Sequence, residues 1–158
     1  MPRADRNAAI GLVTSWLTGL SSGRLSARQV TSPHTDIEVV DTRTGRETPL
    51  KLAVREFSQS DREGKNFRVR EAALRADPDG IILLLYLNDE YLRESGQPIK
   101  AAWVLSHREF LSQGLTVSSN GDYQCRPLHS PVRRDEWSPY RYFTETALVD
   151  QITTLCAG

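Results

Sequence analysis

The sequence lacks the features that mark most zinc proteins, disulfide-rich proteins and membrane proteins. Cys125 and Cys156 stand alone, without a C-x-x-C pair or a histidine at zinc-ligand spacing. Two cysteines also do not make a disulfide framework. The apolar run "IILLLYL", from Ile81 to Leu87, is far too short to cross a bilayer. The N-terminal residues lack the continuous apolar region of a signal peptide, so we expect a cytoplasmic protein with no membrane segment.

An excess of charge of one sign is also missing. The chain has 20 lysines and arginines against 20 aspartates and glutamates, and its formal net charge is zero. This balance argues against a non-specific nucleic-acid coat protein, which would be strongly basic, but it leaves room for a local basic patch. No glycine-rich nucleotide-binding loop and no G-x-S-x-G nucleophile motif is present. Nucleotide binding and serine-hydrolase chemistry are therefore unsupported.

What the sequence does contain is the pattern of one α/β domain. A chain of 158 residues, of which 39% are hydrophobic, favours a single domain over residues 1–158. Apolar residues at helical spacing predict a helix over residues 5–20, and a short strand is expected within 24–30. Residues 35–58 alternate apolar and polar side chains around a polar turn that contains Gly45. This alternation predicts a β-hairpin.

The rest of the chain combines helices with buried strands. A capping box, S-x-x-E, predicts that a helix begins at Ser60 and runs to about residue 76. Continuous apolar runs predict strands buried on both faces over 81–87 and 100–106. A second capping box opens a short helix at Ser106, and helical spacing predicts a C-terminal helix over 143–155.

The predicted element order is helix, three strands, helix, two strands, short helix, loops and helix. A hairpin combined with a buried strand behind a crossover helix implies a sheet of mixed direction. Residues 5–113 form the predicted core, and residues 114–158 form a loop-rich extension with the last helix. This order, with Asp36 in "SPHTDIEVV" and "AVR" seventeen residues later, resembles the PD-(D/E)XK nuclease superfamily and its restriction-endonuclease-like fold.

The resemblance implies a site for metal-dependent cleavage of nucleic acids. In that superfamily an aspartate at the start of the second strand and an acid on the third strand hold divalent cations beside the scissile phosphate, with a lysine two residues after the acid. Asp36 stands where the aspartate belongs, but Ala53 and Arg55 replace the acid and the lysine. Ala53 cannot bind a metal, and Arg55 is a poor general base, although its guanidinium suits a phosphate. Strand alternation places Asp36, Glu38, Ala53 and Arg55 on one face.

Three explanations of Ala53 and Arg55 remain open. Under loss, which we favour, the chain keeps a nuclease-like fold and binds nucleic acid or a protein partner, without a cofactor. Under migration, Asp36 and Glu38 bind Mg²⁺ or Mn²⁺ and Arg55 holds the phosphate, which gives an active DNA or RNA endonuclease. Glu38 could instead be a solvated strand residue paired across the hairpin. The third explanation is an accidental resemblance, in which case the chain is another small α/β domain.

Two observations would separate loss from migration. An ion pair between Arg55 and Asp36 or Glu38, filling the cleft, would favour a binding module. Metal bound at Asp36 would favour the enzyme. Among the histidines, His34 and His129 are expected in loops and His107 in a structural position at the start of a helix.

A second region combines arginines with aromatic residues in "RRDEWSPYRYF". This composition is found at nucleic-acid and protein interfaces, and also in loops whose aromatic side chains pack back onto a core. An exposed aromatic surface there would also suit association with a second copy of the chain. The residues predicted to contact nucleic acid or a partner are Arg133, Arg134, Trp137, Tyr140 and Arg141.

Overall fold

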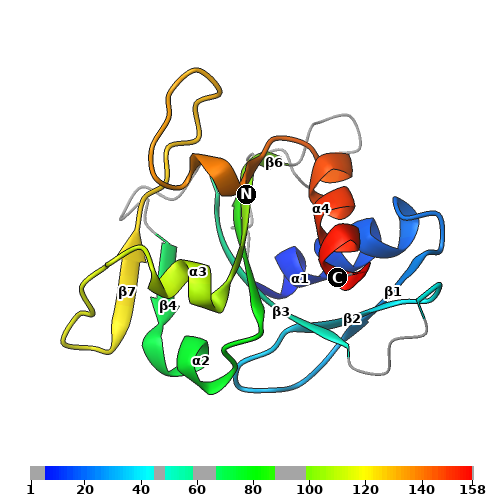
Figure 1. Ribbon diagram of the computed structural model, residues 1–158, viewed down its shortest axis with the longest axis horizontal. Coiled ribbons are helices and arrows are strands. Elements are labelled where there is room, and N and C mark those ends of the chain that lie inside the picture. Colours follow the sequence, from blue (N-terminus) through cyan, green and yellow to red (C-terminus); the bar gives the residue numbers. More distant parts are fainter. Residues whose placement is uncertain (1–5, 45–48, 59–66, 88–98, 158) are drawn as a thin grey trace.

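The computed structural model describes residues 6–44, 49–58, 67–87 and 99–157, which fold around a mixed β-sheet (Figure 1). The helices are α1 (Arg6–Gly19), α2 (Glu71–Ala76), α3 (His107–Leu111) and α4 (Glu145–Ala157), with a 3₁₀ helix η1 (Ser138–Tyr140). The strands are β1 (Leu25–Gln29), β2 (Ile37–Asp41), β3 (Leu50–Ser58), β4 (Phe67–Arg70), β5 (Ile81–Leu87), β6 (Ile99–Ser106), β7 (Asp122–Cys125) and β8 (Arg141–Tyr142). The mixed α/β class is therefore as predicted.

Six strands of the described chain form the main sheet in the order β1-β2-β3-β5-β6-β8, and β4 pairs with β7 in a separate sheet. The β3–β5 pair is parallel, and the other pairs are antiparallel. A parallel pair requires a crossover, and here β4 and α2 lie between the two strands in sequence. The predicted hairpin of β2 and β3 and the mixed strand directions are confirmed.

The centre of the sheet is buried on both faces. All seven residues of β5 are buried, which is why its sequence is continuously apolar. Its odd-numbered residues join one hydrophobic cluster, while Ile82, Leu84 and Tyr86 join another on the opposite face. Figure 1 shows α1 and α4 on one side of the sheet and α2, α3, β4 and β7 on the other.

The two longest helices cover the first of these faces. Ala9, Val13 and Leu17 of α1 follow one another at a spacing of four residues and are fully buried. Leu148 and Ile152 of α4 do the same and belong to the same cluster. The other face of the sheet carries the candidate site.

The predicted helix over 60–76 is wrong over residues 67–70, which form strand β4, and is confirmed over Glu71–Ala76, which form α2. Phe67 and Val69 are buried, while the two arginines between and after them are exposed, which is the alternation of a strand. Pairing with β7 stabilises this strand. The capping box at Ser60 and the turn glycine Gly45 lie outside the described residues.

The second capping box is confirmed. The Oγ atom of Ser106 accepts the N–H of Glu109 at 3.0 Å, and the Glu109 carboxylate accepts the N–H of Ser106 at 2.8 Å. These two bonds satisfy amide groups that have no partner inside a helix. In the described ranges, no helix is long and apolar enough to cross a membrane.

The extension over 114–158 is built into the same structure. Strand β8 adds the last strand to the main sheet, and α4 packs on the cluster that α1 covers. Strand β7 completes the small sheet by pairing with β4. The C-terminal part of the chain therefore contributes to both faces of the main sheet.

Candidate functional site

Asp36 lies at the entry to β2, where its backbone joins three strands. Its N–H donates to the carbonyl of Leu52 on β3 at 3.0 Å, and its own carbonyl accepts the N–H of Val30 at 3.0 Å. The pairing of Ile37 with Leu52 then places Asp36 opposite Ala53. The residue is 5% exposed. The backbone therefore fixes Asp36 beside the third strand, as the predicted hairpin requires.

The Asp36 carboxylate is held by a backbone amide and by a guanidinium group. Its Oδ2 atom accepts the N–H of Val54 at 2.7 Å and lies 3.3 Å from Nη1 of Arg55. The same Nη1 donates to the Val54 carbonyl at 2.7 Å. Both side chains are largely buried, with exposed fractions of 7% for Asp36 and 18% for Arg55. The Asp36–Arg55 ion pair thus occupies the position where the resemblance would have a metal ligand.

Ala53 and Arg55 lie on the same face of the sheet. In the parallel register Ala53 is beside Ile82 and Arg55 is beside Leu84, two residues whose side chains belong to one cluster. Ala53 is 5% exposed. A buried methyl group, which cannot bind a metal, therefore stands where the resemblance would place the second metal-binding acid.

Glu38 takes part in a row of charges across three strands. Its Oε1 atom forms an ion pair with Nη2 of Arg28, its register partner on β1. Lys51 lies opposite Glu38 on β3, and its Nζ atom is 3.9 Å from Oδ2 of Asp77. Among the residues that the structure describes, no three His, Cys, Asp or Glu side chains gather as a ligand set for a metal ion. The contacts of Glu38 are those of a strand residue in a cross-strand ladder.

His107 lies under the same face and is packed against Gly80. The Nδ1 atom of His107 is 2.6 Å from the carbonyl oxygen of Asp77. Because a carbonyl can only accept, Nδ1 carries the proton and Nε2 has the lone pair. A Cβ atom at Gly80 would lie 2.7 Å from Cε1 of His107, so only glycine fits there without a shift. The sequence analysis did not find this contact, because the two residues are far apart in the chain.

The environment of His107 favours its neutral form. Burial lowers the pKa of His107 from its ordinary value, and the nearby positive charge of Arg55 lowers this pKa further. The backbone carbonyls of Asp77 and Leu74 act in the opposite direction.

The aromatic residues of the second predicted region lie mostly inside the protein. Trp137 is 3% exposed, and its ring centroid is 5.5 Å from that of Phe110. Tyr140 is partly buried against the same cluster. The Arg141 guanidinium lies 5.0 Å from the ring centroid of Phe143. The exposed residues in this region are Arg133, Arg134, Glu136 and Pro139.

Cys125 and Cys156 are both buried, and within the described residues neither forms a disulfide. Burial raises the pKa of the Cys125 thiol to about 12. At neutral pH this thiol is therefore protonated, and it is a poor nucleophile and a poor metal ligand.

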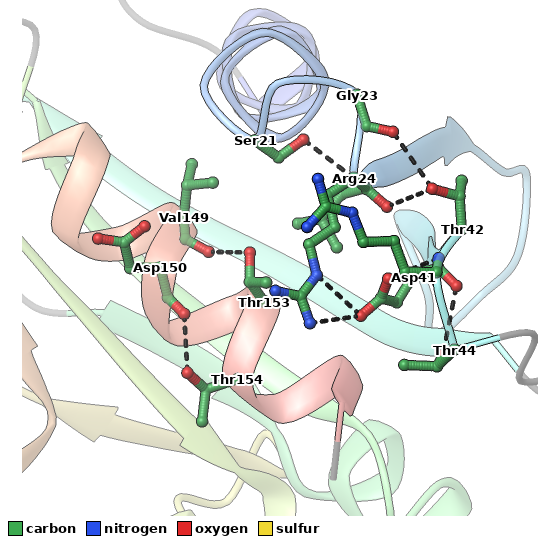
Figure 2. Close-up of polar contacts among 12 residues, drawn as sticks. Ser21, Gly23, Arg24, Asp41, Thr42, Thr44, Val149, Asp150, Thr153 and Thr154 are labelled. Atoms are coloured by element: carbon green, nitrogen blue, oxygen red, sulfur yellow. Dashed lines mark hydrogen bonds and ion pairs between the residues drawn. The ribbon is translucent and has the colours of Figure 1, made fainter.

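A second buried aspartate lies at the other end of β2 (Figure 2). The Oδ2 atom of Asp41 accepts from Nε and Nη2 of Arg24 at 3.2 and 3.1 Å, and its Oδ1 atom accepts the N–H of Arg43 at 2.9 Å. The Thr42 hydroxyl donates to the Arg24 carbonyl at 2.9 Å. These bonds join the start of β1 to the turn after β2. The sequence analysis did not single out this pair.

Comparison of the chain with protein-family models, with curated proteins and with solved structures finds no match. The function is therefore argued from the geometry of the site.

Proposed function

We propose that this chain is a nuclease-like domain with a degenerate PD-(D/E)XK site, and that it binds nucleic acid as an accessory module without cutting it. The order of elements supports the proposal. Helix α1 is followed by three antiparallel strands, a crossover that contains α2, and strand β5, which is parallel to β3. This is the order on which the resemblance rests.

The observation that carries the proposal is the Asp36–Arg55 ion pair. A divalent cation that used Asp36 would have to displace a guanidinium nitrogen 3.3 Å away, or tolerate its positive charge. Mg²⁺ also prefers several oxygen ligands in octahedral geometry, and Ala53 supplies none. Breaking a buried pair by removing one charge is costly, so the pair opposes metal binding. These arguments favour loss of the metal chemistry.

The contacts of Glu38 weigh against migration of the lost acid. Glu38 is paired with Arg28, which competes with a cation for its carboxylate, and its register partner on β3 is the basic residue Lys51. A metal site made of Asp36 and Glu38 would have to break both this ladder and the Asp36–Arg55 ion pair. Migration therefore requires a larger rearrangement than loss.

Isothermal calorimetry with MgCl₂ and MnCl₂ tests the loss of the metal site. We expect the wild type to show no saturable metal binding at Asp36, so that its titration matches that of Asp36→Asn. The variant Ala53→Glu/Arg55→Lys rebuilds the motif of the superfamily and is expected to gain such binding, since it supplies a second carboxylate and removes the fixed guanidinium. Its fold is checked by circular dichroism.

The opposite result would support the alternative, an active endonuclease that uses Asp36, Glu38 and Arg55. Wild-type binding of Mn²⁺ that Asp36→Asn abolishes, together with Mn²⁺-dependent cleavage of a mixed panel of DNA and RNA, would overturn the proposal. The binding function is tested separately in EDTA, where we expect the wild type to bind nucleic acid without a divalent cation. Absence of binding to every DNA and RNA would overturn that part.

A further inference from the structure

The segment between β7 and η1 forms a loop that extends away from the body of the protein, drawn in orange in Figure 1. We call residues 126–136 the arginine loop. Its two ends are joined by Asp135, whose Oδ2 atom accepts the N–H of Leu128 at 2.7 Å. The Oδ1 atom of Asp135 accepts the N–H of Trp137 at 3.0 Å, and its own N–H donates to Oγ of Ser138 at 2.8 Å. One carboxylate therefore closes the base of the loop.

A guanidinium group holds the loop from the other side. Nη1 of Arg141 donates to the carbonyl of Leu128 at 2.7 Å and to the carbonyl of Arg133 at 3.0 Å. Below the loop, Trp137 is buried against Phe110. Bonds to Asp135 and Arg141 hold the base of the loop, and the Arg141 bond to the Arg133 carbonyl also holds the backbone near its tip. These bonds constrain the shape of the loop before any partner binds, which lowers the entropy lost on binding.

The tip of this fixed loop carries two arginines and an apolar side chain. Val132 is 87% exposed, and Arg133 and Arg134 are both exposed. Within the described ranges neither guanidinium belongs to an ion pair, whereas Arg75 and Arg108, which are also exposed, pair with Glu71 and Asp79. The loop therefore presents two adjacent positive charges that no acidic side chain of the described chain neutralises.

Lys100 lies near the loop and adds a further positive charge. Within the loop, His129 is exposed, and its ring centroid lies 4.8 Å from that of Tyr86. Nζ of Lys100 lies 5.7 Å from the centroid of the same ring. The acidic groups in the loop are Asp135, which is used at its base, and the exposed Glu136. In a chain of zero net charge, Lys100 and the exposed arginines of the loop make a local concentration of positive charge.

We propose that the arginine loop is the contact surface for double-stranded nucleic acid, with Arg133 and Arg134 on backbone phosphates and Val132 against the sugars or bases between them. This inference rests on the proposed function, because it names the surface through which the domain binds. A guanidinium fork matches paired phosphate oxygens, and proteins that bind DNA grooves frequently combine arginines with an inserted apolar side chain.

Other partners fit the loop less well. Proteins that hold single strands stack bases on exposed aromatic rings, but Trp137 is buried and Tyr140 is partly buried. A stable protein interface needs roughly 800 Å² on each partner with an apolar core, and one exposed valine does not supply it. A duplex requires only fixed positive charges at the spacing of phosphates.

Fluorescence anisotropy with a labelled DNA duplex, an RNA duplex and a single strand, at several salt concentrations in EDTA, tests the inference. We expect Arg133→Ala/Arg134→Ala to bind a duplex at least tenfold more weakly than the wild type. For DNA, the slope of log association constant against log salt concentration is negative, and its magnitude should fall by about 1.8, since each phosphate contact contributes about 0.9. Val132→Ser should weaken binding a few-fold without changing the slope, because it removes no charge.

The matched control is Arg75→Ala/Arg108→Ala, which removes the same charge from two exposed arginines on α2 and α3. We expect it to bind like the wild type, and melting curves should show that both double variants are folded. Equal losses in the two double variants would overturn the inference, since binding would then follow net charge alone. Wild-type affinity in Arg133→Ala/Arg134→Ala would overturn the inference and leave the proposed function standing. Absence of binding by the wild type would overturn both.

Discussion

The two ends of β2 each hold a buried aspartate paired with an arginine, but they differ in what surrounds the pair. Asp41 accepts from Arg24 and from the N–H of Arg43, within a set of turn bonds that joins β1 to β2 (Figure 2). Asp36 accepts from Arg55 and from the N–H of Val54, within the sheet itself. The chemistry of the two pairs is almost the same.

The comparison teaches that a buried aspartate does not by itself mark a metal site. Asp41 is explained by the turn that it holds together. The Asp36–Arg55 ion pair lies within the sheet beside Ala53, where the superfamily resemblance would have its chemistry. Under the proposed function, Asp41 is structural and Asp36 is the remnant of a site in which an arginine has taken the place of a cation.

The largest effect is expected from breaking the pair at the candidate site. Arg55→Met should lower the free energy of unfolding by about 3 kcal/mol, because it leaves the Asp36 carboxylate buried without its counter-charge. Asp36→Asn/Arg55→Met should recover much of this loss, since Asn can still accept the N–H of Val54. Urea denaturation measures both values. Arg28→Met, which breaks the exposed pair with Glu38, is the control and should cost less than about 1 kcal/mol. Equal costs for Arg55→Met and Arg28→Met would contradict the buried role of Arg55.

The next largest effect is expected from the close contact between Gly80 and the His107 ring. Gly80→Ala should lower the free energy of unfolding by about 2 kcal/mol, because the new Cβ would lie 2.7 Å from Cε1 of His107. In a His107→Ala background the same substitution should cost much less, which a double-mutant cycle measures. The control is Gly11→Ala in α1, because the new Cβ would meet no atom within 4 Å. Gly114→Ala is unsuitable as a control, because the φ of Gly114 is +74°. If Gly80→Ala lowered the free energy of unfolding equally in the wild-type and His107→Ala backgrounds, the contact with His107 would not be the cause of the loss.

The structural pair should be visible in acid. Bonding to Arg24 lowers the pKa of Asp41 from its ordinary value of 3.8, and the N–H of Arg43 adds to this effect. A lowered folded pKa means that this contribution to stability is complete above about pH 4 and is lost as the pH falls through the folded pKa. Asp41→Asn should therefore lower the melting temperature at pH 7 and flatten its fall below pH 4. Asp150→Asn, an exposed residue of α4, should do neither. A wild-type acid profile in Asp41→Asn would contradict this interpretation.

A smaller effect with the same sign should arise from His107 at higher pH. Burial lowers the pKa of His107 below its ordinary value of 6.5, so the unfolded chain binds a proton that the folded chain excludes. Stability from this group is complete above about pH 6.5 and falls as the pH is lowered toward the folded pKa. His107→Asn keeps a donor near the Asp77 carbonyl without a titrating ring. His107→Asn should therefore reduce the fall of the melting temperature between pH 7 and pH 5. The control His129→Asn, which alters an exposed ring, should leave this fall unchanged.

Much of the fold could be predicted because its signals are local. Helical spacing in α1, alternation in β2 and β3, the apolar run of β5 and the Ser106–Glu109 capping box each lie within a few residues. Strand β4 was missed because its pairing partner, β7, is more than fifty residues later in the sequence. Its alternation was visible, but the capping box upstream favoured a helix.

The candidate site was predictable only where the hairpin register defines it. The pairing of β2 with β3 brings Asp36 beside Ala53 and Arg55, and this follows from alternation and turn position. The Arg28–Glu38 pair depends on the register of β1, and the contact of Gly80 with His107 depends on packing between distant segments. Such contacts leave no local pattern in a single sequence.

The most direct test of the central claim is paramagnetic broadening of amide NMR signals by Mn²⁺ in the wild type. If the Asp36–Arg55 ion pair has replaced the cation, the signals of Asp36, Val54 and Arg55 should broaden no more than those around the Asp41 pair. Selective broadening at Asp36 and Val54 at low Mn²⁺ concentration would show a surviving metal site and contradict the account.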